Sequence, residues 1–411
     1  MGKHKLLDAM KQHKIRLDRN EVFALLCSLV AEQLISSRHN DFNAAASRAW
    51  NRDTSLGEAG MEMDSIELMQ AASAVDEFFH LHETGVEEYL LRHRSLGAWC
   101  DIVLQAFPNG HRHLTFRTSG SQGVAKVHQH RAAALLEETS ALARLFPGRS
   151  RVVTLVAPHH IYGLLFSVLL PQALQLPVLD ARNWTAGKIL RNLQTGDLVI
   201  GFPLLWQALL RYGHGFPDDV FGVTSTAPCD AGLIISLGQA GLARMTEIYG
   251  SSETAGIGYR HDPSRAYRLF SHWDKVPLGR KSPPDYGLKR NGQKSILPPD
   301  LLDWRSALTF RHLGRRDMAV QVAGVNVYPD EIAQRLQDHP GITACALRLM
   351  RADEGDRLKA YIVLQSGHRS TTARRELEKW IFSQFKAAER PVSLTYGLAL
   401  PITKLGKLTD W

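Results

Sequence analysis

With 411 residues, the chain is long enough for two to three domains with a large core. Its hydrophobic content of 44% and charged content of 22% are typical of a globular protein and exclude a largely disordered chain. The net charge of +8 is uneven, because residues 17–107 hold 15 acidic side chains against 6 Arg and no Lys. That segment carries −9 and leaves +17 on the remainder, which favours docking between modules or an anionic substrate. Because no RNA-binding motif or zinc finger accompanies the charge, we expect no nucleic-acid partner.

The cysteines and the N-terminus indicate a reducing compartment. The 4 cysteines lie far apart without a CxxC pair, so the sequence predicts neither a disulfide framework nor a zinc site. The N-terminus is basic but lacks the apolar core and cleavage site of a signal peptide. The longest apolar run, residues 22–35, is too short to cross a bilayer. We therefore expect a cytoplasmic protein with no membrane span.

The N-terminal quarter of the chain predicts a small helical bundle. Residues 1–17 form a basic tail, and residues 18–107 contain apolar positions at helical spacing. Residues 108–112, with Pro, Asn and Gly in a row, are typical of a linker. The predicted helices cover residues 21–35, 66–79, 86–92 and 96–107.

The rest of the chain alternates strand and helix patterns, which is typical of a mostly parallel sheet. We expect a large α/β domain at 108–313 and a small α+β domain at 314–411. The strands of the large domain are predicted at 151–157, 176–179, 197–202, 220–225 and 244–249, and its helices at 163–173, 185–193, 204–212 and 231–240. The small domain has predicted strands at 308–313, 318–322, 345–350 and 358–364, and helices at 329–339 and 371–386.

Residues 114–130, LTFRTSGSQGVAKVHQH, predict a loop that holds an anion. Gly120 and Gly123 let the backbone turn tightly and bring its N–H groups against a phosphate. The spacing differs from that of a Walker P-loop, and an ordinary Ser/Gly loop is the alternative. Hydroxyl donors and a cation stand beside the glycines, at Thr118, Ser119, Ser121 and Lys126.

Further motifs follow this loop, and together they resemble those of the adenylate-forming superfamily, which contains acyl-CoA synthetases, peptide-synthetase adenylation domains and luciferases. They are PHHIYGL at 158–164, STAP at 225–228, YGSSE at 249–253, GRRD at 314–317, VAGVNVYPDEI at 322–332 and PITKLGK at 401–407. The resemblance implies a large α/β domain and a small C-terminal α+β domain, here preceded by the helical bundle. In the loop, Gln122 and Ala125 depart from the family's usual Thr and Pro.

The resemblance also implies a role for each matching residue. The implied catalytic residues are Lys407, Glu253 and Lys126, with Glu253 also holding Mg²⁺. The implied ATP-binding residues are Thr118, Ser119, Gly120, Ser121, Gly123, Tyr249, Gly250, Ser252, Asp300 and Arg315. The implied acyl pocket involves His160, Tyr162 and Gly163, the hinge Asp317, and the pantetheine tunnel Gly324.

The bundle itself resembles an acyl carrier protein over DTSLGEAGMEMDSIELMQAASAVDEFF, residues 53–79. On this resemblance Ser65 bears 4′-phosphopantetheine at a helix N-terminus, where a phosphodiester is favoured. A carrier usually has Gly two residues before the Asp, whereas Glu62 stands there. The alternative is that Ser65 is the N-cap of the helix at 66–79, assisted by Asp64.

Paired histidines suggest a metal, but they lack further ligands at zinc spacing. Apart from His160, we expect them to face solvent or lie in loops. These residues are His111, His113, His128, His130 and His159.

The leading prediction is an ATP-dependent acid–thiol ligase that forms an acyl-adenylate and transfers the acyl group to a pantetheine thiol. The expected substrate is an aromatic or fatty acid, with ATP and Mg²⁺ required. The thiol belongs to CoA, to a separate carrier protein, or to an arm on Ser65. The alternative is a non-catalytic carrier or docking protein with a degenerate ligase domain.

Overall fold

The computed structural model describes residues 14–38, 47, 49–57, 60–118, 126–227, 229–279, 285–290, 292–316, 320–351, 353–401 and 411. The chain divides into two compact units. The first contains Met1–Thr118, Val127–Pro298 and Trp304–Arg311, and the second contains Ser119–Lys126, Pro299–Asp303 and His312–Trp411. The helices predicted as a bundle therefore belong to the same unit as the large sheet. Among the described residues, no helix is long and apolar enough to cross a membrane.

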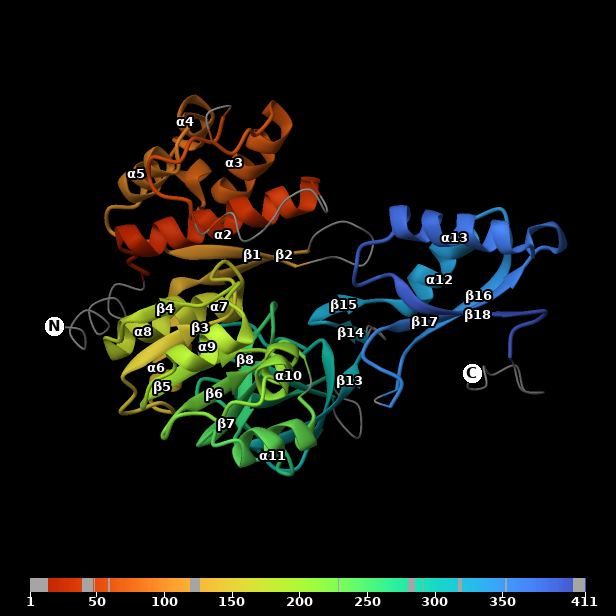
Figure 1. Cartoon of the computed structure of the whole chain (residues 1–411). Coiled ribbons are helices and arrows are strands. Elements are labelled where there is room, and N and C mark those ends of the chain that lie inside the picture. Colours follow the sequence, from red (N-terminus) through yellow and green to blue (C-terminus); the bar gives the residue numbers. More distant parts are fainter. Residues whose placement is uncertain are drawn as a thin grey trace. The chain divides into compact units, whose positions relative to one another are not determined.

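The bundle helices form where the apolar spacing predicts them and gather on one side of β1 (Figure 1). They are α2 (Arg19–Arg38), α3 (Ser65–Phe79), α4 (Glu87–Arg92) and α5 (Leu96–Ala106), with a 3₁₀ turn, η2 (Leu81–Glu83), after α3. An ion pair of 2.5 Å between Arg38 and Glu67 ties the end of α2 to the start of α3. Ile15, placed by sequence in the basic tail, is fully buried and pairs with His111. The two ends of the bundle segment therefore meet.

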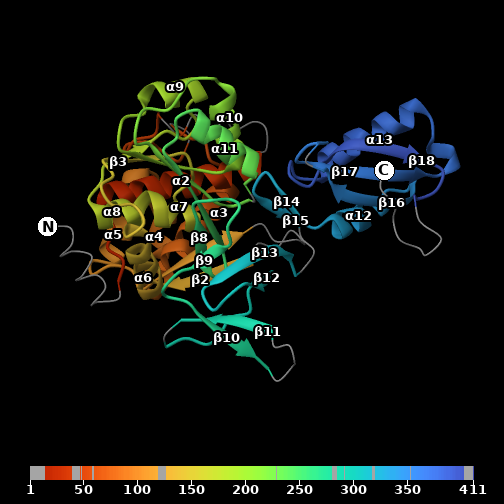
Figure 2. The same ribbon diagram turned by 90° about the horizontal axis from the view of Figure 1, so that it is seen from below.

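A nine-stranded sheet has the order β12-β13-β9-β8-β7-β6-β5-β3-β4. Its strands from β3 to β9 lie in the first unit, whereas most of β12 and the end of β13 are assigned to the second. The neighbours from β4 to β7 are parallel, and β8 and β9 continue antiparallel. The parallel strands are β3 (Arg151–Thr154), β4 (Val178–Asp180), β5 (Asp197–Gly201), β6 (Phe221–Thr224) and β7 (Arg244–Ser251). The others are β8 (Ala255–Arg260), β9 (Tyr267–Leu269), β12 (Asp300–Trp304) and β13 (Thr309–Arg315). Two further pairs are β1 (His113–Thr118) with β2 (Lys126–Arg131), and β10 (Asp274–Leu278) with β11 (Asp285–Lys289), which Figure 2 shows as a separate hairpin.

Helices connect the parallel strands and cover the sheet. They are α6 (Ala132–Ala143), α7 (Ile161–Leu164), the π-helical turn η3 (Leu165–Leu169), α8 (Leu170–Leu174), α9 (Ala186–Asn192), α10 (Pro203–Arg211) and α11 (Ala231–Gln239). One core cluster joins β3, β5 and β7 to α9, α10 and α11 around the fully buried Trp206. The sequence predicted the parallel strands, most of these helices and, at 308–313, the strand β13, but not α6 or the other strands of this sheet after β7.

The second unit is a small α+β structure with its own core. Its strands are β14 (Val320–Val322), β15 (Val325–Val327), β16 (Ile342–Leu349), β17 (Leu358–Leu364) and β18 (Pro391–Gly397). Its helices are α12 (Pro329–Gln337) and α13 (Thr371–Gln384), with a 3₁₀ turn, η4, at Ser366–His368. Both helices pack apolar residues against the three-stranded sheet β16-β17-β18. Each unit therefore has a hydrophobic core of its own.

Candidate active site

The predicted site residues of the first unit gather at one edge of its sheet. The loop after β3 leads to His160, the segment after β6 begins at Ser225, and β7 ends in the YGSSE turn. Because these strands are parallel, their carboxyl ends share one edge. Ligands of open α/β sheets bind outside such carboxyl ends.

The loop after β3 carries the residues predicted to border an acyl pocket. His160 is exposed and precedes α7, whereas Tyr162 is buried and donates hydrogen bonds to the Gly201 and Val223 carbonyls, at 3.0 and 3.3 Å. Burial raises the pKa of the Tyr162 hydroxyl well above its ordinary value, so this group stays protonated. A Cβ on Gly163 would lie 1.9 Å from the Ala157 carbonyl oxygen. Tyr162 and Gly163 therefore fix the loop to the sheet, while the His160 ring packs against that of His159, with ring centres 4.1 Å apart.

A chain of polar contacts continues from this loop to α2. His159 Nε2 lies 2.6 Å from Glu32 Oε2, and its Nδ1 lies 2.7 Å from Ser28 Oγ. Ser28 Oγ also accepts a hydrogen bond of 3.0 Å from Arg182. Burial raises the pKa of Glu32, but the hydrogen bond and charge of His159 outweigh it and hold that pKa well below its ordinary range. Glu32 is therefore ionised at neutral pH.

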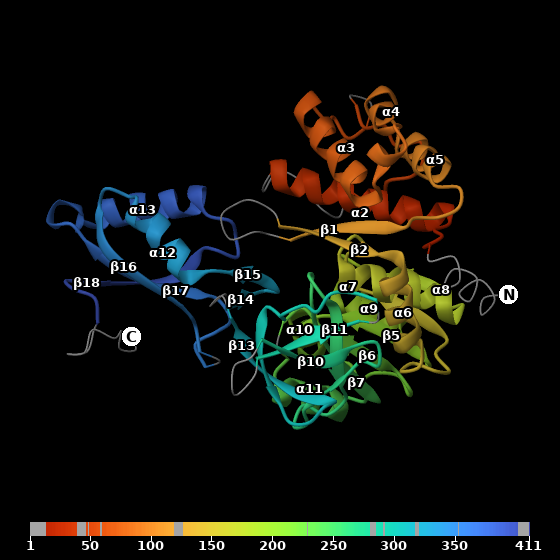
Figure 3. The same cartoon turned by 180° about the vertical axis from the view of Figure 1, so that it is seen from behind.

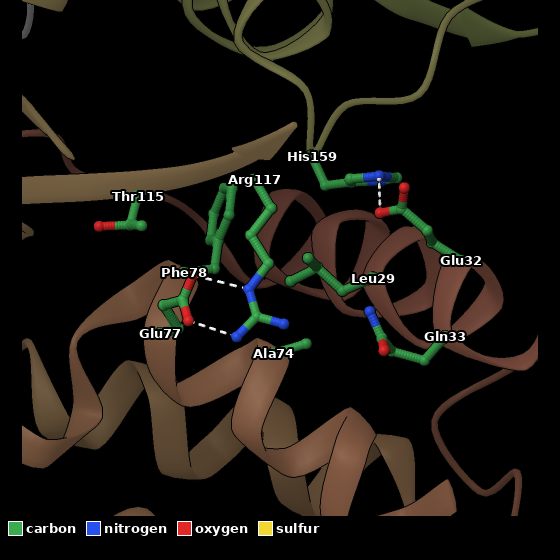
Figure 4. A pocket seen from close by; sticks show the side chains of 9 residues that line it. All are labelled: Leu29, Glu32, Gln33, Ala74, Glu77, Phe78, Thr115, Arg117 and His159. Carbon is green, nitrogen blue, oxygen red and sulfur yellow. Dashed lines mark hydrogen bonds and ion pairs between the residues drawn. The ribbon is translucent and has the colours of Figure 1, made fainter. Parts of the chain in front are cut away.

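Glu32 and His159 line a pocket between α2, α3 and β1 (Figure 4). A second ion pair, between Arg117 of β1 and Glu77 of α3, forms another part of its wall. The remaining lining residues are Leu29, Gln33, Ala74, Phe78 and Thr115. The pocket thus combines apolar surface with charged groups.

The YGSSE turn holds four of the predicted site residues, Tyr249, Gly250, Ser252 and Glu253. The Tyr249 ring packs against Tyr267 and Phe310, with ring centres 5.5 and 5.3 Å apart. A Cβ on Gly250 would lie 2.2 Å from the Ala255 carbonyl oxygen, so only glycine fits this hairpin. Ser251 Oγ and Thr254 Oγ1 lie 3.0 Å apart and close the turn. Ser252 and Glu253 stand at its tip, partly exposed.

Two histidines of β2 support this turn. His130 Nε2 donates a hydrogen bond of 2.7 Å to the Ser252 carbonyl oxygen, and His128 Nε2 lies 3.9 Å from Glu253 Oε1. Burial lowers the pKa of His130 to about 4, so its imidazole is neutral at pH 7. We expected these histidines to face solvent or lie in loops, and this was wrong for His130, which is 9% exposed within β2. His111 and His159 lie outside the helices and strands, as expected, but they are only 3% and 7% exposed. Each is buried because its ring packs or bonds between elements distant in sequence.

A buried ion pair behind the turn was missed by sequence reasoning. Arg290 donates to Glu138 Oε2 at 3.0 Å, and Glu138 Oε1 accepts from the Gly256 N–H at 2.8 Å. Burial raises the pKa of Glu138 to about 7, although Arg290 and the Gly256 N–H act in the opposite direction. Arg290 also reaches the Thr254 carbonyl at 3.4 Å, which links the pair to the turn. Glu138 shares a helical face with Leu135 and Leu142, and this spacing was the signal that it is buried.

The second unit holds a separate set of predicted residues. Asp300 is 6% exposed and its Oδ2 lies 3.5 Å from His312 Nε2. Arg316 donates a hydrogen bond of 3.3 Å to the Asp300 carbonyl oxygen. Gly324 has φ of 82° in the two-residue turn between β14 and β15, a conformation that glycine adopts without strain.

The structure places only some residues of the predicted phosphate loop. Lys126 is the exposed first residue of β2, and Thr118 is the last of β1. Arg315 ends β13. Ser119, Gly120, Ser121, Gly123, Asp317 and Lys407 lie outside the described residues.

Ser65 is the exposed first residue of α3. The alternative of Ser65 as N-cap was wrong, because Asp64 caps the helix and accepts a 2.8 Å hydrogen bond from the Glu67 N–H. Glu67 reciprocates by accepting from the Asp64 N–H, which completes a capping box. The Ser65 side chain is therefore not needed to cap the helix.

Comparison with solved structures defines the class of fold. The o-succinylbenzoate CoA synthetase of Bacillus subtilis superposes with a TM-score of 0.59 at 16% identity, covering 95% of this chain and 92% of that one. This likeness shows the two-part fold of adenylate-forming ligases, as the sequence motifs predicted. No family model matches the chain.

Curated relatives make the assignment more specific. A 4-coumarate–CoA ligase of Halorhodospira halophila is 36% identical over 395 residues, covering 95% of this chain and 99% of the relative. A 4-coumarate–CoA ligase of Rhodobacter capsulatus is 35% identical, covering 94% of this chain and 99% of the relative. The chain belongs to the acyl-CoA synthetase family within the adenylate-forming superfamily, and it is an AMP-forming acid–thiol ligase.

Proposed function

We propose that the chain activates an aromatic acid of the hydroxycinnamate type with ATP and transfers the acyl group to CoA. Both relatives that match nearly the whole chain are 4-coumarate–CoA ligases. An aryl-propenoate is long, flat and largely apolar, and needs polar partners only at its two ends. The loop at 157–160 offers such partners beside apolar residues of α2 and α3.

The proposal rests on one observation, that the loop after β3 and the turn after β7 lie at the same edge of the sheet. The acyl-side loop after β3 and the nucleotide-side turn after β7 stand at the carboxyl ends of strands in one parallel array. An acid and a nucleotide bound there would meet along this edge. The in-line attack of a carboxylate on the α-phosphate needs such positioning more than it needs acid–base catalysis.

Each predicted residue then has a defined role. Tyr249 offers an aromatic face to the adenine, and Asp300 and Arg315 bind the ribose hydroxyls. Thr118 to Lys126 cradle the phosphates, and Lys407 offsets charge between the carboxylate and the α-phosphate. Glu253 fits Mg²⁺, because it presents a carboxylate oxygen and its side chain is 32% exposed at the turn. When bound, Mg²⁺ neutralises phosphate charge.

We propose free CoA as the acceptor, with Asp317 as hinge and Gly324 lining the pantetheine channel. The near-complete match to CoA ligases includes the helical bundle, so the bundle is part of the ligase architecture that these proteins share. The described cysteines are free thiols, which suits the reducing cytoplasm where ATP and CoA are available. The competing acceptor is a 4′-phosphopantetheine arm on Ser65.

Separate assays of the two half-reactions test the proposal. ATP–pyrophosphate exchange measures adenylation, and chromatography of acyl-CoA measures transfer, for 4-coumarate, caffeate, cinnamate, benzoate and a medium-chain fatty acid. We expect exchange and thioester formation to be fastest with a hydroxycinnamate. Preference for the fatty acid would overturn the substrate class, and exchange no faster in wild type than in Lys407→Ala would overturn the ligase itself.

Intact-mass analysis decides the acceptor. The wild-type chain and Ser65→Ala are treated with a broad phosphopantetheinyl transferase and CoA, then assayed with free CoA. We expect no mass gain and equal acyl-CoA formation by both proteins. A pantetheine-sized gain on wild type alone, together with acylation of that arm, would make the bundle a carrier.

A further inference from the structure

A cluster of metal-ligating side chains lies at the end of α3, away from the sheet edge described above. The chain leaves α3 at His80, which adopts the left-handed conformation with φ of 61°, and then forms the 3₁₀ turn η2. The His80 and Glu83 side chains lie next to each other, with His82 between them in sequence. One ligand atom from each of the three residues lies within 4.8 Å of the others.

The distance between two of these ligand atoms matches that expected around a tetrahedral metal ion. His80 Nδ1 lies 3.4 Å from Glu83 Oε1. Two ligand atoms bound to Zn²⁺ at its usual bond lengths are about 3.3–3.5 Å apart in a tetrahedron. The ring centres of His80 and His82 lie 5.5 Å apart, close to the about 5 Å expected for two imidazoles on one tetrahedral ion.

Each histidine also has an outer partner of the kind that orients metal ligands. Thr115 Oγ1 of β1 lies 2.8 Å from His80 Nε2, which leaves Nδ1 directed at Glu83. Asp76 Oδ1 lies 3.0 Å from His82 Nδ1 and also accepts the His82 backbone N–H at 2.7 Å. A carboxylate or hydroxyl on the second ring nitrogen fixes the tautomer and the ring orientation of a metal-bound histidine.

A second His/Glu cluster in the described part of the chain lacks this spacing. Glu32, His159 and His160 also bring ligand atoms within 4.8 Å. However, His159 Nε2 and Glu32 Oε2 are only 2.6 Å apart, which is the distance of an ion pair or hydrogen bond and too short for two ligands of one ion. The geometry therefore favours the turn after α3.

We propose that His80, His82 and Glu83 bind one divalent first-row transition-metal ion of the Zn²⁺ type, with water completing the coordination. Two imidazoles and one carboxylate select such ions over Mg²⁺ or Ca²⁺, which prefer oxygen ligands alone. The half-exposed side chains of His82 and Glu83 leave room for the water.

The ion would connect the bundle to β1. α3 packs against β1 (Figure 3), and the contact between His80 and Thr115 is part of that junction. β1 runs directly into the segment 119–125 that the sequence assigns to the ATP phosphates. Metal binding at His80 therefore stabilises the junction between α3 and β1.

Zinc titration of the full-length protein without an affinity tag tests the proposal. Metal is removed by dialysis against a chelator, and Zn²⁺ affinity is measured by competition with a chromophoric chelator. We expect the protein to bind one equivalent of Zn²⁺ tightly and to melt at a higher temperature with Zn²⁺ than without it. Co²⁺ substitution should give the intense visible absorption of a tetrahedral site.

Matched variants locate the ion. His82→Gln and Glu83→Gln change half-exposed side chains and should remove the tight equivalent, whereas Asp76→Asn should weaken Zn²⁺ binding by about 10- to 100-fold. His93→Gln, at an exposed histidine of the same bundle, should bind as wild type does. Tight binding that survives His82→Gln and Glu83→Gln, or that is lost in Glu32→Gln instead, would overturn the proposal, as would the absence of a tight equivalent in wild type.

Discussion

The turn at residues 249–254 and the loop at 157–160 stand at the same edge of one sheet, but they are supported in different ways. Behind the turn lies the Glu138–Arg290 pair, whose side chains are 0% and 3% exposed. The loop is tied to α2 by the Glu32–His159 pair, in which the Glu32 side chain is 46% exposed. A buried ion pair holds the neighbouring backbone rigidly, because separating its charges inside the protein costs much free energy. A half-exposed ion pair can rearrange with little loss of free energy, because water solvates its charges.

This difference fits a ligase that binds a nucleotide on one side of its site and an acid on the other. The nucleotide is the same in every turnover, so its side of the site gains from a rigid support. On the proposed function, the acid side of the site includes the loop at 157–160, which the bundle helix α2 contacts through Glu32. We therefore expect changes near the turn to affect stability and adenylation, and changes near the loop to affect the choice of acid.

Breaking the buried pair should have the largest effect. Arg290→Met leaves the Glu138 carboxylate buried without its guanidinium partner, and we expect the free energy of unfolding to fall by about 3–5 kcal/mol. Urea denaturation measures the loss. Lys289→Met, at the exposed neighbouring position, is the control and should change stability little.

A double variant tests the cause. Adding Glu138→Gln to Arg290→Met removes the uncompensated charge, and we expect it to restore part of the lost stability. If Arg290→Met and Lys289→Met unfold at the same urea concentration, the pair does not support the turn.

Glu253 at the tip of the same turn should affect chemistry rather than stability. We expect Glu253→Gln to lower the rate of pyrophosphate exchange by about 100-fold or more and to raise the Mg²⁺ concentration needed for half-maximal rate. The melting temperature should stay unchanged because the side chain is partly exposed. Glu137→Gln, at an exposed position of α6, is the matched control, and an Mg²⁺ requirement equal to wild type would exclude a metal-binding role.

The sequence predicted the parallel part of the fold because buried parallel strands form short continuous apolar runs, as in β5. It missed β8 to β12, in part because β8 contains two glycines, β10 a proline and β11 a glycine, which are unfavourable in strands. The predicted site residues of both units come from the family motifs. One of them, Gly324, lies in the turn between β14 and β15 with φ of 82°.

The supporting residues could not be found in this way. Glu138 and Arg290 lie 152 positions apart, and nothing local in the sequence pairs them. His130 was expected near solvent because histidine is polar, but one hydrogen bond to Ser252 satisfies its ring inside the protein. Which carboxylate or imidazole is buried depends on contacts between distant elements.

Acid should destabilise the chain through its buried histidines. Burial lowers the pKa of His111 and His130 to about 4 and that of His272 to about 3, compared with 6.5 for an ordinary imidazole. Between pH 4 and pH 6.5 these histidines are protonated in the unfolded chain but neutral in the folded one. The stability that depends on the neutral rings is therefore complete above pH 6.5 and is lost as the pH falls toward 4. We expect a loss of about 1 kcal/mol for each such histidine at pH 5.5.

Urea denaturation between pH 8 and pH 5.5 measures this loss. His130→Gln keeps a donor for the Ser252 carbonyl and removes one titrating group, so its stability should depend less on pH than that of wild type. His93→Gln, which removes an exposed histidine, should leave the pH dependence as it is. Equal pH dependence in all three proteins would contradict a neutral, buried His130.

The acyl-side loop should give the smallest change in stability and the clearest change in selectivity. Glu32→Gln removes the charge of a half-exposed pair, and we expect it to cost less than about 1 kcal/mol. It also frees the His159 ring beside the predicted acyl-pocket residue His160, whose ring centre lies 4.1 Å away. The ratio of kcat/KM between 4-coumarate and cinnamate, which differ only in the hydroxyl, should therefore change while the KM for ATP does not. Gln33→Ala removes a neighbouring pocket side chain without touching the ion pair, and an equal change in that variant would assign the effect to pocket volume rather than to the Glu32 charge.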